Sequence, residues 1–235
     1  MNRRNPFSAF KVITATHDAR SRFDHVERNY PQVVDELLMK FSRLDQDSVQ
    51  RLHRFLDQPM YNIRESNFNC IDELPEILHE PMEHARRLYE SSCHLTRDIQ
   101  YTTDDIREFC TLTGLSGSAA SEQTGPLGIF TAALVNTCSE PYFEFNCRGH
   151  QSKLHFMGFG LESGKHMVVQ GNLGHFTGAA LNGGELKING EVDCLCAAGM
   201  IKGRIKIVSE KPSTPAQKRQ RWFYGIPEEI LEIVR

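Results

Sequence analysis

Cysteines and histidines are the residues of this 235-residue chain whose types and spacing could do chemistry. Thiolate sulfur and imidazole nitrogen are ligands that zinc prefers in proteins. Cys147 and His150 stand three residues apart, and Cys194 and Cys196 stand two apart. The two pairs fall in different positions of a repeat that spans residues 128–209, so we interpret them as buried or edge thiols. We therefore expect no metal ion and no other cofactor.

Three histidines are candidate functional residues, although no catalytic residue is predicted. His166 shares its position in the repeat with apolar residues such as Phe143 and Leu186. A histidine among apolar groups needs a hydrogen-bond partner or stays neutral, so His166 is interpreted as a core or rim residue, with a base or ligand as the alternative. His155 and His175 stand beside phenylalanines of the repeat. We expect both to point outward from neighbouring units, close enough to pair.

Motifs that identify an enzyme are missing from this sequence. It contains no nucleophile elbow, no HExxH string and no paired-carboxylate motif. Gly158-Phe159-Gly160 lacks the strand and helix that give a nucleotide-binding glycine motif its meaning, so these are interpreted as turn glycines. We therefore expect no catalytic activity of its own, and an autonomous enzyme using His166 or the cysteines is the remaining alternative.

Basic side chains gather in the last 34 residues and could form a partner surface. Lysine and arginine alternate with isoleucine after position 200, which places the charges on one face of a strand. The residues concerned are Lys202, Arg204, Lys206, Arg219 and Arg221, together with Trp222. One interpretation is a solvated edge. The other is a docking surface for an acidic partner, such as the helical half of this chain or of a second copy.

Composition excludes several classes of partner. The formal net charge is −3, whereas nucleic-acid-binding domains usually carry a basic excess. Residues 1–114 hold 15 Lys and Arg against 19 Asp and Glu, and residues 115–235 hold 12 against 11. No apolar run approaches the length of about 20 residues that crosses a bilayer, and no secretory signal is visible. Seven irregularly spaced cysteines predict free thiols. We expect a cytoplasmic protein without nucleic-acid or membrane partners.

The first 114 residues have the apolar spacing of helices. Residues 31–42 and 47–57 place apolar side chains three and four apart, and a third helix is predicted to begin near Pro81. A fourth is predicted over 103–114, with Thr103 as a cap and Gly114 after its end. Residues 115–126 are small and polar and predict a linker.

Four segments after the linker align with one another. They begin at Gly128 (GIFTAALVN), Leu154 (LHFMGFGLE), Gly174 (GHFTGAALN) and Cys194 (CLCAAGMIK), at intervals of 26, 20 and 20 residues. A second short alternating strand follows each segment. Matching columns in successive units are typical of a coil that stacks on itself at about 4.8 Å per turn. Phe130, Phe156 and Phe176 share a column and are expected to form an internal ladder.

The segments GNLGHFTGAALNGGELKING (171–190) and AAGMIKGRIKI (197–207) resemble a known repeat. It is the GxGxG-type repeat found in the C-terminal domain of the large chain of glutamate synthase and in one of the component chains of formylmethanofuran dehydrogenase. The resemblance implies a right-handed β-helix that scaffolds catalytic domains and carries no active-site residue. Cys194, Cys196 and Lys202 depart from the pattern, and residues 1–114 lie outside it.

Together these patterns predict an α+β protein. Residues 1–114 form a helical domain, 115–126 a linker, 127–210 a right-handed β-helix of about four turns, and 211–235 a basic loop with a C-terminal capping helix. The predicted function is a non-enzymatic scaffold or assembly module that binds a protein partner or forms a homodimer through the β-helix. The alternative, implied only by the resemblance, is an accessory subunit of an enzyme complex for one-carbon (formyl) or amide-nitrogen transfer.

Overall fold

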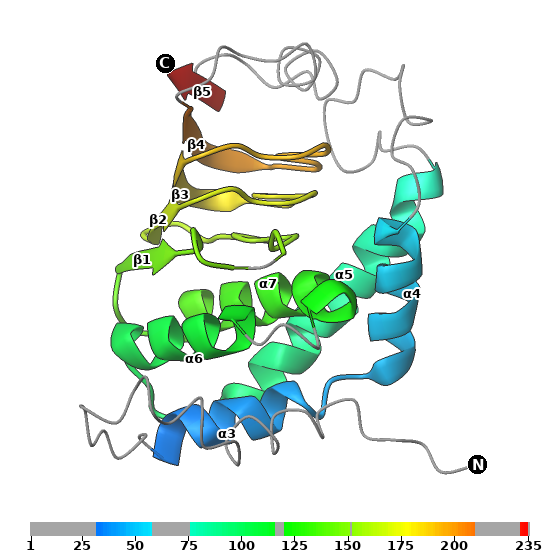
Figure 1. Cartoon of the computed structure of the whole chain (residues 1–235), viewed down its shortest axis with the longest axis vertical. Helices are drawn as coiled ribbons and strands as arrows, with labels where there is room; N and C mark the ends of the chain where they lie inside the picture. The colour runs from blue at the N-terminus through cyan, green and yellow to red at the C-terminus, as the bar shows by residue number, and fades with distance from the viewer. Residues whose placement is uncertain (1–31, 58–75, 116–119, 151, 210–230, 235) are drawn as a thin grey trace.

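The computed structural model describes residues 32–57, 76–115, 120–150, 152–209 and 231–234, in which helices precede strands (Figure 1). The helices are α3 (Gln32–Phe41), α4 (Gln46–Leu56), α5 (Glu76–Thr96), α6 (Thr103–Leu115) and α7 (Ala120–Thr137). The strands are β1 (Tyr142–Asn146), β2 (His166–Gln170), β3 (Asn182–Asn189), β4 (Lys202–Val208) and β5 (Leu231–Val234). None of the described helices is long and apolar enough to span a bilayer.

The strands form one all-parallel sheet in chain order, β1 to β5. Phe143, Met167, Leu186 and Ile205 lie opposite one another on β1 to β4, and all four are buried. Burial alternates along each of these strands, so the other face of the sheet points outward. Figure 1 shows the strands stacked over α6 and α7.

The connections from β2 to β3 and from β3 to β4 contain no helix, although parallel strands are usually joined by one. Successive connections are instead hydrogen-bonded to each other. The amide of Phe156 donates to the carbonyl of His175 at 2.9 Å, and the amide of Ala180 donates to that of Ala198 at 2.8 Å. The rings of Phe156 and Phe176 stack with centroids 4.6 Å apart and planes 1° from parallel.

The predicted ladder of three phenylalanines is therefore correct for Phe156 and Phe176 and wrong for Phe130. Phe130 lies in α7, where its ring contacts those of Phe41 at 5.3 Å and Phe109 at 5.2 Å. The three rings join α3, α6 and α7. They belong to the same apolar core as the buried face of the sheet.

Helix α7 lies between the other helices and the strand connections, and residues 124–135 are buried without interruption. Its close approach to the connections depends on Gly128. A β-carbon at this position would lie 1.9 Å from the carbonyl oxygen of His155, so no larger residue fits without moving backbone. Because α7 is apolar on every side, it lacks the amphipathic period by which a surface helix is recognised.

The predicted right-handed β-helix of four turns with a capping helix is wrong. The arrangement is α/β-like, with helices that mostly precede a single parallel sheet. Residues 120–126 of the expected linker and the first segment of the expected first turn, 128–136, belong to α7, and residues 231–234 form strand β5 where a helix was expected. The right-handed β-helix implied by the resemblance to the GxGxG-type repeat is therefore wrong for this chain as well.

Helix α6 begins at the predicted residue but is capped differently. The amide and hydroxyl of Thr102 donate to Asp105 Oδ2 at 2.9 and 2.8 Å, which makes Thr102 and Asp105 a reciprocal cap. Thr103 donates instead to Glu140, which precedes β1, at 3.1 Å from its amide and 2.8 Å from its hydroxyl. These bonds fix the start of α6 against the sheet.

Candidate functional site

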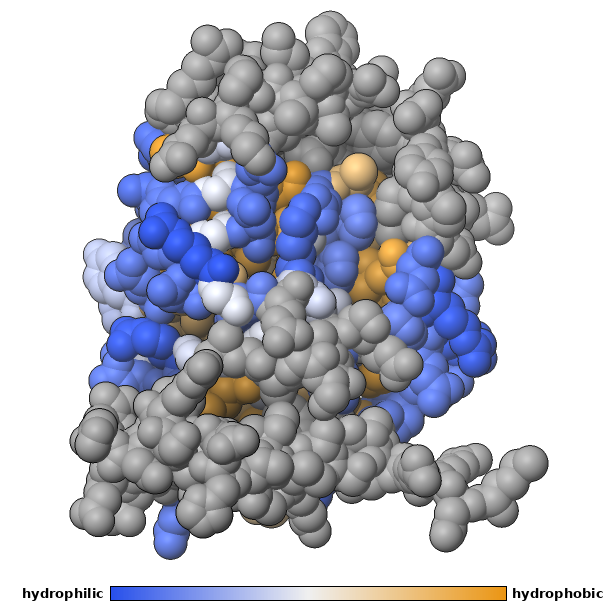
Figure 2. Space-filling model, in the orientation of Figure 1, coloured by the Kyte–Doolittle hydropathy of each residue, from blue (hydrophilic) through white to orange (hydrophobic). Residues whose placement is uncertain are grey.

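The outward side chains of β1 to β4 form an ordered surface that we name the outer sheet face. It comprises Tyr142, Glu144, Asn146, His166, Val168, Gln170, Glu185, Lys187, Asn189, Arg204, Lys206 and Val208, all exposed or half-buried. Parallel pairing aligns them in three rows across the strands. Figure 2, in the orientation of Figure 1, shows mostly hydrophilic side chains where the strands and their connections lie.

The first row joins an aromatic ring to charged groups. The Tyr142 side chain, 69 % exposed, stacks on the His166 ring with centroids 4.9 Å apart and planes 18° from parallel. His166 Nδ1 lies 3.1 Å from Glu185 Oε2, and Arg204 lies opposite Glu185 on the next strand. The row therefore places a large apolar ring, an imidazole and both signs of charge on one rigid surface.

The prediction that His166 shares a column with Phe143 and Leu186 is wrong by one position along β2. Met167, and not His166, occupies the buried column with Phe143 and Leu186. A shift of one residue moves every side chain of a strand to the opposite face. His166 is consequently a half-buried residue of the outer face, hydrogen-bonded to Glu185, rather than a core histidine.

Positive charge gathers at the β3–β4 end of this surface. Lys187 lies opposite Lys206, and Arg204 and Lys202 are exposed on β4. Glu185 is the only acidic side chain among the outward residues of β3 and β4 that the structure describes. Three residues of the predicted partner surface, Lys202, Arg204 and Lys206, thus lie together on β4. The other three, Arg219, Arg221 and Trp222, lie outside the described residues.

The third row is held by side-chain amides. Gln170 Nε2 donates to Glu144 Oε1 at 3.1 Å, and Asn189 Nδ2 donates to Gln170 Oε1 at 3.1 Å. These bonds link β1, β2 and β3 across their outer surface. Because they fix long side chains before any partner arrives, less conformational entropy remains to be lost on binding.

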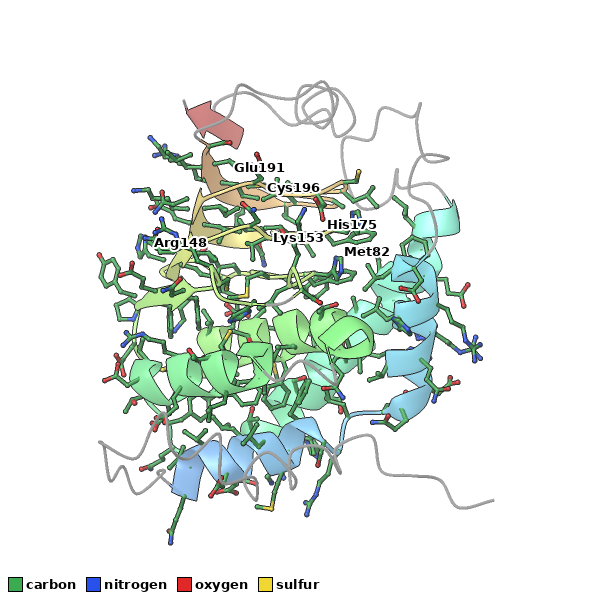
Figure 3. The ribbon with its side chains drawn as sticks, viewed as in Figure 1. Met82, Arg148, Lys153, His175, Glu191 and Cys196 are labelled. Carbon is green, nitrogen blue, oxygen red and sulfur yellow. The ribbon has the colours of Figure 1, made fainter. Side chains whose placement is uncertain are left out.

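His155 and His175 lie together on the strand connections, apart from the outer sheet face. Their rings stack at 5.1 Å, and the amide of His175 donates to His155 Nδ1 at 2.8 Å. Lys153 and Asp193 form an ion pair of 2.6 Å beside them. Figure 3 shows Lys153 and His175 on the connections. The two histidines are thus neighbours on successive connections.

The environment keeps both imidazoles neutral. The pKa of His155 is lowered to about 4, mainly by burial and to a smaller extent by the charge of His175. Burial also lowers the pKa of His175, against an opposing effect of Asp193. His175 Nδ1 is buried and has no hydrogen-bond partner among the described residues. A neutral, half-buried pair of this kind packs the connections together and offers little to a solvent-borne substrate.

Cys110, Cys147 and His150 form a cluster that sequence reasoning missed. Their possible ligand atoms all lie within 4.8 Å of one another. Cys110 comes from α6, and the other two follow β1. Cys147 and His150 were recognised as a pair, but nothing in their spacing indicates a partner 37 residues earlier. Cys194 and Cys196 are not part of this cluster; burial raises the pKa of Cys196 to about 12.

Comparison with models of protein families, with curated proteins and with solved structures finds no match for this chain. Its function is therefore inferred from its own geometry.

Proposed function

We propose that this chain is a non-enzymatic cytoplasmic module that binds an acidic protein partner through the outer sheet face. The observation that carries the proposal is the row of Tyr142, His166, Glu185 and Arg204, with the basic groups beside it. The Tyr142 side chain is 69 % exposed, and a tyrosine presents both an apolar ring and a hydroxyl to a partner.

Two physical properties of this face favour protein binding. Exposed tyrosine and arginine are the side chains that most often dominate interface energies. Lys187, Arg204 and Lys206 would attract an acidic surface and raise the rate of encounter. The amide row between β1 and β3 keeps the surface pre-organised.

The thiols of Cys93, Cys194 and Cys196 support a non-enzymatic role. A nucleophilic cysteine needs a lowered pKa, because the thiolate is the reactive form. In this chain burial raises the pKa of Cys93 and Cys194 and raises that of Cys196 to about 12. These three thiols therefore stay protonated near neutral pH.

Other partner classes are favoured less. Glu144 and Glu185 stand among the basic groups of the outer face, and the chain carries a net charge of −3, which suits a protein surface better than a nucleic-acid backbone. The accessory-subunit hypothesis rests on the repeat resemblance alone and stays a prediction.

Position-specific photo-crosslinking in the native host tests the proposal. A photoreactive amino acid replaces Lys187 on the outer face or, as a matched control, Arg97, which is 63 % exposed beyond the end of α5. Both sites are long, solvent-exposed basic side chains, so differences in yield report the surface and not the reagent. We expect a discrete crosslinked protein from position 187 and none from position 97.

The identity of the product completes the test. A heterologous acidic protein gives the expected result, and a product with the mass of two chains identifies the partner as a second copy on the same face. The proposal is wrong if position 187 gives no discrete product, or if both positions give the same one.

A further inference from the structure

We propose that Cys110, Cys147 and His150 bind one zinc ion, which joins helix α6 to the end of strand β1. The three residues supply two sulfur ligands and one nitrogen ligand, and their ligand atoms lie within 4.8 Å of one another. With zinc–sulfur bonds of about 2.3 Å, tetrahedral coordination places two sulfurs about 3.8 Å apart. The observed cluster therefore needs only small side-chain movements to close around the ion.

Backbone hydrogen bonds hold two of the ligands in place. The amide of Cys147 donates to the carbonyl of Gln170 at 2.7 Å, which fixes the cysteine to the end of β2. The amide of His150 donates to the carbonyl of Cys147 at 3.2 Å, which closes a turn between the two ligands. The turn carries the imidazole back toward the thiol and toward α6.

Helix α6 is shaped to receive the imidazole. Gly114 lies one turn after Cys110 on the same helix, and a β-carbon on Gly114 would lie 2.2 Å from His150 Cε1. Residues four apart share a helix face. The face that presents the Cys110 thiol thus also leaves the space that the His150 ring occupies. Gly114 was predicted to end the helix, whereas it lies within α6 and provides this close approach.

One polar atom of the cluster has no hydrogen-bond partner. His150 Nδ1 is buried and makes no hydrogen bond among the described residues, although buried polar atoms are normally satisfied. In the uncharged imidazole, Nδ1 offers a lone pair when the ring proton is on Nε2. Coordination would satisfy this nitrogen if it is the unprotonated one of the ring.

The two thiols are also suited to a cation. Cys110 and Cys147 are both buried, and their sulfurs lie within 4.8 Å of each other. A zinc ion would displace both thiol protons, and the two thiolates would balance its charge of +2. The buried centre would then carry no net charge. Three protein ligands leave a fourth coordination position for water or another small ligand.

A disulfide between Cys110 and Cys147 is the competing use of the same atoms. Both cysteines are free in the structure. A disulfide would leave His150 Nδ1 without a partner. Zinc accounts for all three side chains, so the geometry favours the metal.

Metal analysis of the full-length chain tests the proposal. The protein is purified anaerobically without chelator, and zinc is measured per chain for the wild type and for the variants Cys147→Ser and His150→Ala. Cys138→Ser is the matched control, because Cys138 is as buried as Cys147 but lies outside the cluster. Circular dichroism confirms that each variant is folded.

We expect one zinc per chain in the wild type and in Cys138→Ser, and a loss of about 100-fold or more in affinity in the other two. Cobalt added to metal-free wild type should give thiolate-to-metal charge-transfer absorption that both ligand variants lack. Folded wild type that binds neither metal, a ligand variant that retains zinc, or a Cys110–Cys147 disulfide in metal-free anaerobic protein would overturn the proposal.

Discussion

The imidazole of His155 stacks on that of His175, with ring centroids 5.1 Å apart and planes 8° from parallel. The backbone amide of His175 donates to Nδ1 of His155, so the pair is bonded as well as stacked. Protonation of either ring would place a charge in a largely buried position beside Lys153. The stack is therefore stable only while both rings are neutral.

This arrangement predicts a loss of stability in mild acid. The pKa of His155 is about 4 in the folded chain and 6.5 in an unperturbed histidine, so the unfolded state binds more protons between these values. The free energy of unfolding should fall by about 3 kcal/mol from this residue as pH drops from 6.5 to 4, and should be unaffected by it above 6.5. Denaturant unfolding at a series of pH values measures the slope of the free energy of unfolding against pH.

His155→Asn should flatten that slope, because asparagine can keep an acceptor near the position of Nδ1 without titrating. His94→Asn, at an exposed site on α5, is the control and should leave the slope unchanged. An equal slope in wild type and His155→Asn would show that the stack does not control acid stability.

The stacked pair of Phe156 and Phe176 should contribute strongly to stability. Both rings are fully buried, and Phe176 also contacts Phe55 of α4 at 5.9 Å. Phe176→Ala should reduce the free energy of unfolding by about 3–5 kcal/mol, since it leaves a cavity among fixed neighbours. Met39→Ala, at a side chain 54 % exposed, should change it by less than about 0.5 kcal/mol. Similar effects at both positions would contradict the packing described.

Two glycines of α7 should respond differently to alanine. In Gly128→Ala the new β-carbon meets the backbone oxygen of His155 at 1.9 Å, whereas in Gly125→Ala it meets the movable side chain of Leu56 at 2.8 Å. Alanine favours a helix by about 1 kcal/mol over glycine, but backbone displacement at position 128 should cost about 3 kcal/mol or more. Thermal unfolding of the two variants compares them. If Gly128→Ala is the more stable, α7 does not pack as described.

The sequence identified helices α3, α4 and α6 because each buries one side against the core and leaves the other in solvent, which produces a visible period. It did not identify α7. That helix is buried on all sides, and its small residues, Gly125 and Gly128 among them, serve close packing where turns were expected. Composition alone cannot separate these two uses of glycine.

The outer sheet face was predicted only in part. Met167, Val168 and Val169 are all apolar, so alternation within β2 does not fix which side faces the core. The neighbouring strands decide the register, and they place His166 outward. Lys202, Arg204 and Lys206 alternate with clearly apolar residues, and for these the strand and its outward side were correct.

The thiol–imidazole cluster could not be found from local spacing. Cys110 belongs to a helix, and it reaches Cys147 only because α6 packs beside β1. The signal available in the sequence was Gly114, an unfavourable residue within a helix. It indicates that some group approaches that helix closely, but does not identify His150 as the group.

Tyr142 should matter for binding and little for folding. Its ring is mostly exposed, and Phe143, the next residue, is the one that enters the core. Tyr142→Ala should change the free energy of unfolding by less than about 1 kcal/mol and weaken partner binding by about tenfold or more, as expected for an aromatic contact in an interface. Denaturant unfolding and a binding titration on the same preparation separate the two effects. A large loss of stability with unchanged affinity would contradict the assignment of Tyr142 to the docking surface.

The central claim is that the basic end of the outer sheet face binds an acidic protein. Its most direct test is calorimetric titration of the partner captured at position 187 with wild type, with the double variant Lys187→Glu and Arg204→Glu, and with the control Arg97→Glu, each at low and high salt. We predict that wild type and control bind equally and lose affinity as salt rises, since exposed charges are screened. The double variant should bind at least about tenfold more weakly and with little dependence on salt. Equal affinity of all three proteins would contradict the claim.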